Sequence, residues 1–87
     1  MGYDFQLLGA MLRLARRREA ADVDALQVRT SGSRADVRAS LRRLERAELV
    51  ERLGEERARL TLAGFAIAVA IRGQRRKAIR QVARRAA

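Results

Sequence analysis

Residues 33–64 decide the fold, and they read SRADVRASLRRLERAELVERLGEERARLTLAG. Ser33 followed three residues later by Asp36 is typical of a capping box with the shorter acid, in which each side chain bonds the other residue's backbone amide. Apolar residues then follow at helical spacing and mark one buried stripe: Val37, Leu41 and Leu44. The stretch therefore predicts a helix that begins at Ser33 and runs to about Ala47.

The periodicity changes at Leu49 from that of a helix to that of a strand. Two runs of alternating apolar and polar residues, 49–53 and 57–62, flank a turn of Gly54, Glu55 and Glu56. Alternation on both sides of a glycine-containing turn predicts a small antiparallel hairpin over about 49–62. Thr61 then stands where it can cap a last helix.

Two further helices are expected before residue 33. A short helix spans about Asp22 to Arg29 with Val23 and Leu26 inward, and residues 30–33, Thr-Ser-Gly-Ser, form a turn after it. The first helix of the chain has one apolar face, with Asp4 in front as a candidate N-cap. That face consists of Phe5, Leu8, Met11, Leu12 and Ala15.

The chain after residue 61 divides by composition. Residues 62–71 are apolar almost all round, so we expect them to be buried between other elements. Gly73 is expected to interrupt this last helix, because glycine costs roughly 1 kcal/mol relative to alanine in a helix interior. Beyond it, Ile79 and Val82 belong to an amphipathic stripe with arginines around it. These features predict one domain over 1–71 and a basic helical extension over 72–87.

The 87 residues include no cysteine, histidine or proline. Without thiols or imidazoles there is no disulfide, no Cys/His zinc site and no usual near-neutral acid/base, so we expect no enzyme activity, metal or cofactor. Twenty basic residues against ten acidic ones give a net charge of +10, and residues 72–87 contain seven basic residues and no acid. Such charge favours nucleic acid as the partner, with an anionic membrane surface second.

The longest apolar stretch, Leu62 to Ile71, is about half the length needed to span a bilayer. No basic-then-apolar leader opens the chain. We therefore expect a cytoplasmic protein with no membrane partner.

The element order resembles the winged helix-turn-helix of bacterial transcription regulators, most closely the MarR type. Residues 33–52 look like that family's recognition helix running into the first wing strand, and Leu60-Thr61-Leu62-Ala63-Gly64 looks like its LTxxG signature. The resemblance implies a mainly α-helical fold with a small β-hairpin and a long C-terminal helix. It also implies a small homodimeric transcription regulator that binds double-stranded DNA sequence-specifically, with the recognition helix (33–47) in the major groove and the wing (49–62) near the minor groove.

Three positions depart from the family pattern. Glu48 stands where glycine usually ends the recognition helix, so either this residue adopts a left-handed conformation or the turn differs. Gly32 stands where an apolar residue usually anchors the turn, and Gln27 where a small alanine lets two helices approach. Family members are also generally longer, with extra helices that form a ligand crevice, so no small-molecule ligand is expected here.

The predicted recognition helix carries the candidate DNA-binding residues. If Val37 points into the core, a rotation of 100° per residue turns the arginines of this helix outward or to its margins. The N-terminal part of a recognition helix meets base edges, so the expected base-reading residues are Arg34, Ala35 and Arg38. The expected phosphate contacts, which add affinity without sequence information, are Ser33, Arg42, Arg43 and Arg46. The alternative is that these arginines are the solvated face of an amphipathic helix.

Three further surfaces have more than one interpretation. In the wing, Arg57 and Arg59 either approach the minor groove or pair across the hairpin with Glu51. The basic tail either clamps the DNA backbone, contacts acidic lipid or solubilises a dimerisation helix; its candidate residues are Arg75, Arg76, Lys77, Arg80 and Arg84. A homodimer interface is expected on the first and last helices, at Phe5, Leu8, Ile67, Ile71, Ile79 and Val82, although Ile67 and Ile71 also suit packing within one chain.

Two other functions compete with DNA-sequence recognition. The main rival is a winged-helix protein-interaction or architectural module that binds DNA without sequence preference, because a fold does not fix a function. A protein bound to a membrane surface comes third, since the basic amphipathic tail alone would suit it.

Overall fold

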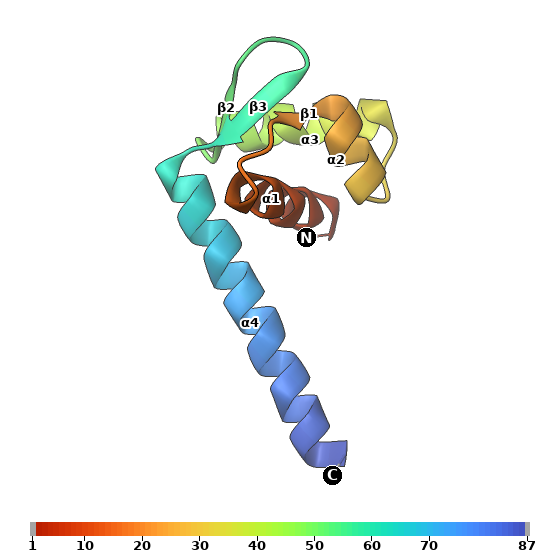
Figure 1. Ribbon diagram of the computed structural model, residues 1–87, viewed down its shortest axis with the longest axis vertical. Helices are drawn as coiled ribbons and strands as arrows, with labels where there is room; N and C mark the ends of the chain where they lie inside the picture. Colours follow the sequence, from red (N-terminus) through yellow and green to blue (C-terminus); the bar gives the residue numbers. More distant parts are fainter. Residues whose placement is uncertain (1, 87) are drawn as a thin grey trace.

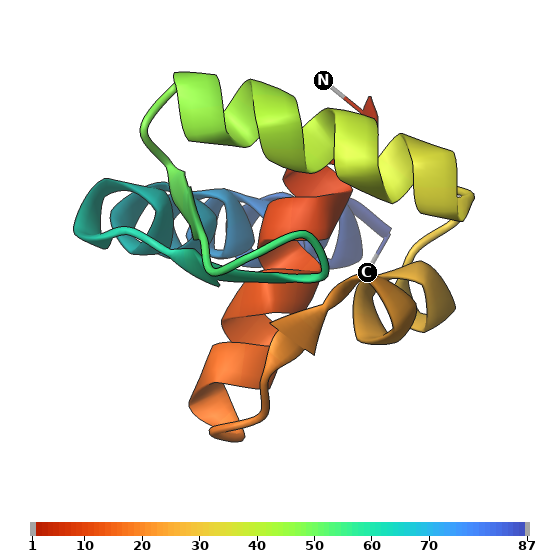
Figure 2. The ribbon, with the colours of Figure 1, turned by 90° about the horizontal axis from the view of Figure 1, so that it is seen from above.

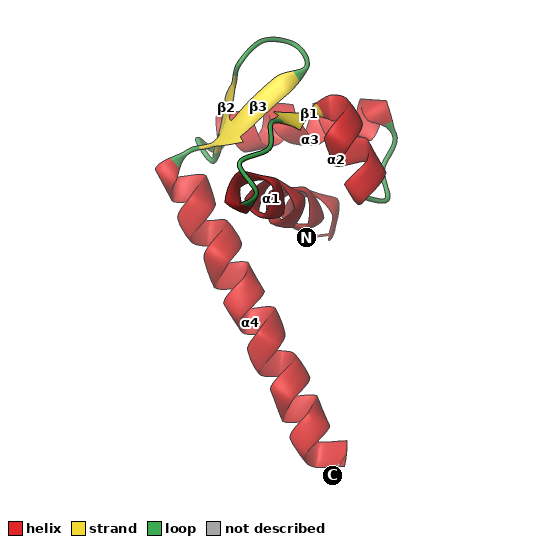
Figure 3. Ribbon diagram, in the orientation of Figure 1, coloured by secondary structure: helices red, strands yellow, loops and turns green. Residues whose placement is uncertain are grey.

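The computed structural model describes residues 2–86, and the side chains in this range except those of residues 75, 76, 78, 79 and 81–86. Over residues 2–86 the chain is mainly helical with a small three-stranded antiparallel sheet (Figures 1 and 3). The helices are α1 (Gly2–Arg16), α2 (Val23–Arg29), α3 (Arg34–Arg46) and α4 (Leu62–Ala86). The strands are β1 (Ala21–Asp22), β2 (Val50–Arg52) and β3 (Arg57–Leu60). The expected mainly α-helical fold with a small hairpin is confirmed.

Side-chain caps set where α2 and α3 begin. The Asp22 carboxylate accepts a hydrogen bond from the Ala25 amide at 2.7 Å. The predicted capping box is present at α3: the Ser33 hydroxyl accepts from the Asp36 amide at 3.1 Å, and the Asp36 carboxylate accepts from the Ser33 amide at 3.0 Å. Asp4, in contrast, lies inside α1 and is not its N-cap, so that prediction is wrong.

The core is built around α1, which crosses the molecule beneath α3 (Figure 2). Neighbouring elements cover α1 on several sides, so its buried residues occupy more than the single predicted face: Leu7, Leu8, Ala10, Met11, Leu12 and Leu14. Ala15, which was expected to face inward, is exposed. Leu8 is fully buried within the chain, so this residue belongs to the core and not to a dimer surface. The predicted stripe of α3 is buried against α1 and α2: Val37, Leu41 and Leu44.

The sheet has β3 at its centre, in the order β1-β3-β2. The hairpin register places Val50 opposite Leu60 and Glu51 opposite Arg59. The third strand, β1, was not predicted, because a strand of two residues is too short to show a periodicity. Its pairing with β3 ties the beginning of α2 to the hairpin.

Two glycines permit close approaches between elements. A Cβ on Gly64 would lie 1.8 Å from the Leu49 carbonyl oxygen, so the first turn of α4 packs directly on the backbone after α3. A Cβ on Gly32 would lie 2.6 Å from the Tyr3 ring, and the Tyr3 hydroxyl is 2.8 Å from that of Thr30. The Tyr3 ring of α1 therefore packs against the turn before α3, at Gly32, where the family pattern usually has an apolar residue.

Glu48 ends the α3 segment in the left-handed conformation, with φ of 62°. The next amide, that of Leu49, donates to the Leu44 carbonyl at 2.9 Å and closes the helix end. Of the two alternatives expected for Glu48, the left-handed conformation is the one found.

Helix α4 departs from expectation in two ways. It begins at the predicted cap, where the Thr61 hydroxyl accepts from the Gly64 amide at 3.1 Å, but it continues unbroken through Gly73 to Ala86. The composition change at residues 71 and 72 therefore falls inside one helix. Residues 62–71 are also not buried all round, because only one side of α4 packs on α1 and β3. Figure 1 shows α4 extending away from the other elements, and with this helix the molecule measures 48 Å along its longest axis.

Candidate nucleic-acid interface

The outward face of α3 is exposed and basic. Val37, Ser40, Leu41 and Leu44 hold the other side of the helix in the core, and this fixes which residues point away from it. Ala35, Arg42 and Arg46 are all exposed. Arg42 and Arg46 make no hydrogen bond or ion pair with any other described residue. Two unpaired guanidinium groups beside a small alanine are what a phosphate backbone approaching this face would meet.

Arg34 and Arg38, the predicted base-reading residues, are held by acidic side chains. One carboxylate oxygen of Glu56 accepts from Arg38 Nη2 at 2.7 Å, and the other accepts from Arg34 Nη2 at 3.1 Å. Arg34 Nη1 also pairs with Asp24 of α2. Both terminal nitrogens of Arg34 are therefore occupied, whereas Nη1 and Nε of Arg38 make no bond to a described residue and can take another acceptor.

Arg43, a predicted phosphate contact, connects α3 to α1 through Asp4. Its Nε and Nη2 donate to the two carboxylate oxygens at 3.0 and 2.8 Å, and the buried Ser40 hydroxyl donates to the same carboxylate at 2.6 Å. These bonds, that of Arg43 first, hold the pKa of Asp4 below its ordinary value, and the same ion pair raises the pKa of Arg43. To contact phosphate, Arg43 would have to share its guanidinium with Asp4.

Ser33 acts first as the cap of α3. Its backbone amide and then its hydroxyl lower the pKa of Asp36, so the capping carboxylate is ionised over the whole neutral range. The hydroxyl oxygen also accepts from the Asp36 amide, so a phosphate oxygen would have to compete with the Asp36 carboxylate for the hydroxyl proton.

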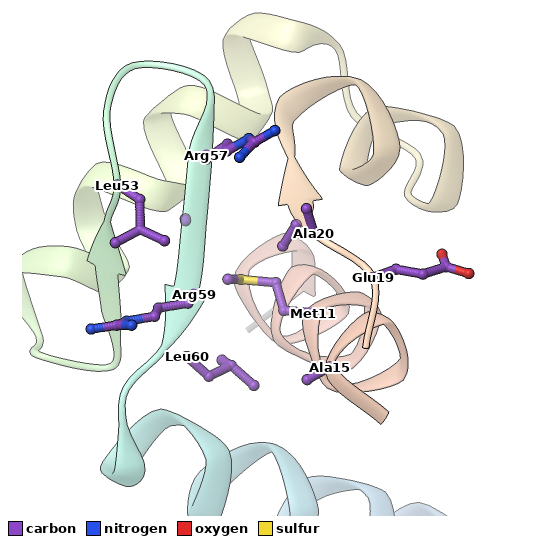
Figure 4. A pocket seen from close by; sticks show the side chains of 10 residues that line it. Met11, Ala15, Glu19, Ala20, Leu53, Arg57, Arg59 and Leu60 are labelled. Carbon is purple, nitrogen blue, oxygen red and sulfur yellow. The ribbon is translucent and has the colours of Figure 1, made fainter. Parts of the chain in front are cut away.

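The two wing arginines have different surroundings. Arg59 Nε and Nη2 donate to the Glu51 carboxylate at 2.9 and 2.8 Å, so for this residue the predicted cross-strand ion pair is confirmed. Arg57 is exposed, with its Cα opposite that of Asp22 in the sheet register. Both arginines line an open cavity of about 250 Å³ between α1 and β3, whose other lining side chains are mainly apolar, such as Met11 and Leu60 (Figure 4).

The basic tail points away from α3. Lys77 and Arg80 are exposed, and Figure 1 shows the C-terminal end of α4 at the opposite end of the long axis from the hairpin. The side chains of Arg75, Arg76 and Arg84 lie outside those that the structure describes. Within one chain, Lys77 and Arg80 are therefore not next to the arginines of α3.

Helix α4 presents an exposed apolar surface along its first three turns. Its large exposed residues are Leu62 (89% exposed), Phe65 (40%), Ile67 (38%) and Val69 (40%). No charged residue interrupts the sequence from 62 to 71. Of the other predicted dimer residues, Phe5 and Ile71 are half-buried against the core, and the side chains of Ile79 and Val82 are outside the described set.

Comparisons of the chain with protein-family models, with curated proteins and with solved structures give no match. Among residues 2–86, no helix is both long and apolar enough to cross a membrane. Within the described part of the chain, no three acidic side chains come together as a metal ion would require.

Sequence reasoning missed the acidic partners of the α3 arginines. Ser40 gave a usable signal for Asp4, because a serine inside the buried stripe of a helix needs a hydrogen-bond partner from a neighbouring element. Nothing comparable pointed to Glu56 or Asp24. Their contacts depend on how the hairpin and α2 sit beside α3, and the unpredicted pairing of β1 with β3 fixes that arrangement.

Proposed function

We propose that this protein is a small homodimeric transcription regulator that binds double-stranded DNA sequence-specifically through a winged helix-turn-helix. In this proposal α2 and α3 are the helix-turn-helix, and β2 and β3 are the wing. The observation that carries the proposal is the outward face of α3, where Arg42 and Arg46 are exposed and make no ion pair with a described side chain. A module that docks only proteins has no evident use for free arginines along this helix.

The contacts divide by their position along α3. Its N-terminal half, with Arg34, Ala35 and Arg38, would meet base edges in the major groove. Arg42 and Arg46, further along, would contact phosphate, together with the hydroxyl of Ser33 at the helix N-terminus. Arg38 is the stronger candidate base reader of the two arginines, because two of its guanidinium nitrogens make no bond to a described residue.

The apolar surface of α4 supports the homodimer. Leu62, Phe65, Ile67 and Val69 are too exposed to be explained by packing within one chain. Leu62, Phe65 and Val69 share one face of α4, which a second copy of α4 would cover, whereas Ile67 lies on the flank of the helix nearer Ile71 and Phe5. A two-fold dimer would also present two α3 helices to successive major grooves on one side of the duplex.

The test measures DNA affinity by fluorescence anisotropy over a range of salt concentrations. The variant Arg42→Gln/Arg46→Gln should bind every sequence more weakly, and the salt slope should fall by up to about 0.9 for each lost phosphate contact. The control, Arg13→Gln/Arg17→Gln, removes the same charge from exposed residues near the C-terminal end of α1, which Figure 2 shows well away from α3. Equal losses in both variants would mean that net charge, and not the α3 face, drives binding.

One observation favours a second candidate, an architectural protein that binds DNA without sequence preference. Arg34 has both terminal nitrogens occupied, whereas the predicted phosphate contacts Arg42 and Arg46 are free. Selection from a random pool of duplexes distinguishes the two candidates. A regulator enriches one sequence, and an architectural protein enriches none.

A further inference from the structure

The hairpin turn reaches the N-terminal half of α3 through a single residue, Glu56. Its backbone carbonyl accepts from the Val23 amide at 2.9 Å, and the next residue, Arg57, pairs with Asp22 in the sheet. The backbone at Glu56 and Arg57 is therefore fixed by β1 and by the first residue of α2. From this fixed point its carboxylate bonds Arg34 and Arg38 simultaneously.

The charges in this cluster cancel. Arg34 and Arg38 supply two positive charges, and Glu56 and Asp24 supply two negative ones. All four side chains are 42 to 73% exposed, so these ion pairs contribute little to folding. Their position on the proposed DNA-binding surface means that they act mainly on binding.

We propose that Glu56 is a specificity-determining residue, which competes with DNA phosphate for Arg34 and Arg38 and so weakens binding to sequences that lack the preferred bases. This inference rests on the proposed function. On DNA of arbitrary sequence, a neutral cluster releases few counterions, and the Glu56 carboxylate repels the backbone. On the preferred site, bidentate contacts of an arginine with a guanine edge replace the bonds lost to Glu56. Specificity then comes from a lower affinity for duplexes that lack the preferred bases.

The chain offers a closely matched control at the neighbouring position. Glu55 lies in the same turn and carries the same charge, but its side chain makes no hydrogen bond or ion pair with a described residue. Glu55→Gln and Glu56→Gln therefore change the net charge equally. Only Glu56→Gln removes the carboxylate that holds Arg38 Nη2 and Arg34 Nη2, while Arg34 Nη1 stays paired with Asp24.

The experiment compares two duplexes of equal length, one selected from a random pool by the parent protein and one of arbitrary sequence. Relative to Glu55→Gln, Glu56→Gln should bind the arbitrary duplex about three- to tenfold more tightly and with a salt slope steeper by up to about 0.9. Its affinity for the selected duplex should change less, so the ratio of the two affinities falls. In an Arg34→Gln/Arg38→Gln background, the substitution at Glu56 should have no more effect than the one at Glu55.

Several results would overturn the inference. One is equal behaviour of the two glutamate variants, and another is an effect of Glu56→Gln that persists without Arg34 and Arg38. A loss of affinity for the selected duplex in Glu56→Gln would instead mean that Glu56 positions the arginines for binding. If the parent protein binds neither duplex at any salt concentration, the proposed function itself fails, and that result is distinct from the others.

Discussion

Two glycines in α4 provide a test of the packing, because the same substitution should have opposite effects nine residues apart. In Gly64→Ala the new Cβ would lie 1.8 Å from the Leu49 carbonyl oxygen, whereas an ordinary C···O contact is about 3.3 Å or more. The first turn of α4 would have to move by roughly 1.5 Å from the backbone at Leu49. That movement strains the bond from the Thr61 amide to the same oxygen, which is 3.1 Å long.

The expected cost has two parts. Overpacking against a backbone atom costs about 1 to 3 kcal/mol, and the weakened hydrogen bond adds about 1 kcal/mol. Gly64→Ala should therefore lower the free energy of unfolding by about 3 kcal/mol, or Tm by roughly 12 to 24 °C in a domain of this size. Gly73, in contrast, lies in mid-helix, and a Cβ added there would meet nothing within 4 Å. Gly73→Ala should raise stability by about 1 kcal/mol and Tm by roughly 4 to 8 °C.

Thermal unfolding followed by far-ultraviolet circular dichroism measures both variants, at one protomer concentration because the proposed dimer would make Tm depend on that concentration. A Gly64→Ala protein as stable as the parent would refute the close approach of α4 to Leu49. A Gly73→Ala protein that is less stable than the parent would refute the continuous helix.

Three further outcomes are expected. Arg38→Ala should cost about 1 to 3 kcal/mol on a selected DNA site and relax sequence preference, while Arg42→Ala should weaken binding to all sequences alike; identical profiles for the two variants would contradict the division of α3 into base-reading and phosphate-binding halves. Light scattering at micromolar concentration should give about twice the 9.8 kDa of one chain, and Leu62→Gln/Val69→Gln should reduce this to a monomer; a dimer that survives both substitutions would place the interface elsewhere. The bonds of Arg43 and Ser40 lower the pKa of Asp4 in the folded state, so their contribution to stability is fully present above the ordinary aspartate value of 3.8 and is lost as the pH falls through the lower, folded value. The difference in unfolding free energy between the parent and Asp4→Asn, measured by urea unfolding, should therefore be large at pH 6 and small at pH 2.5. A difference that does not change with pH would contradict this.

The sequence was most informative for elements whose structure is determined by residues close together in the chain. The Ser33 and Asp36 capping box, the α3 stripe and the hairpin depend on neighbours in the chain, and each was predictable from spacing alone. The burial of α1 was not predictable in this way, because a helix that is covered on several sides has no single apolar face. For residues 62–71 the error was the opposite one, because less of the helix is buried than the sequence predicted. Their uniform apolarity predicted burial within the chain, yet one side of the helix is exposed.

The residues of the proposed DNA-binding surface were predictable from the sequence, but the acidic partners of its arginines were not. The helical rotation correctly turned Arg42 and Arg46 outward, since that follows from Val37 pointing inward. That Arg34 and Arg38 are held by Glu56, and Arg43 by Asp4, depends on contacts between residues 18 to 39 positions apart. Such contacts follow from the relative placement of elements, which charge patterning along a chain does not specify.

The contact of Tyr3 with the turn between α2 and α3 makes an intrinsic optical signal available. Tyr3 is the only tyrosine of the chain, which has no tryptophan, and its hydroxyl lies 2.8 Å from that of Thr30 while its ring covers Gly32. The phenol absorption and near-ultraviolet dichroism of the protein therefore come mainly from one ring at the junction of three helices. Any movement of α2 and α3 relative to α1 changes the surroundings of that ring, so it can be followed spectroscopically without attaching a label.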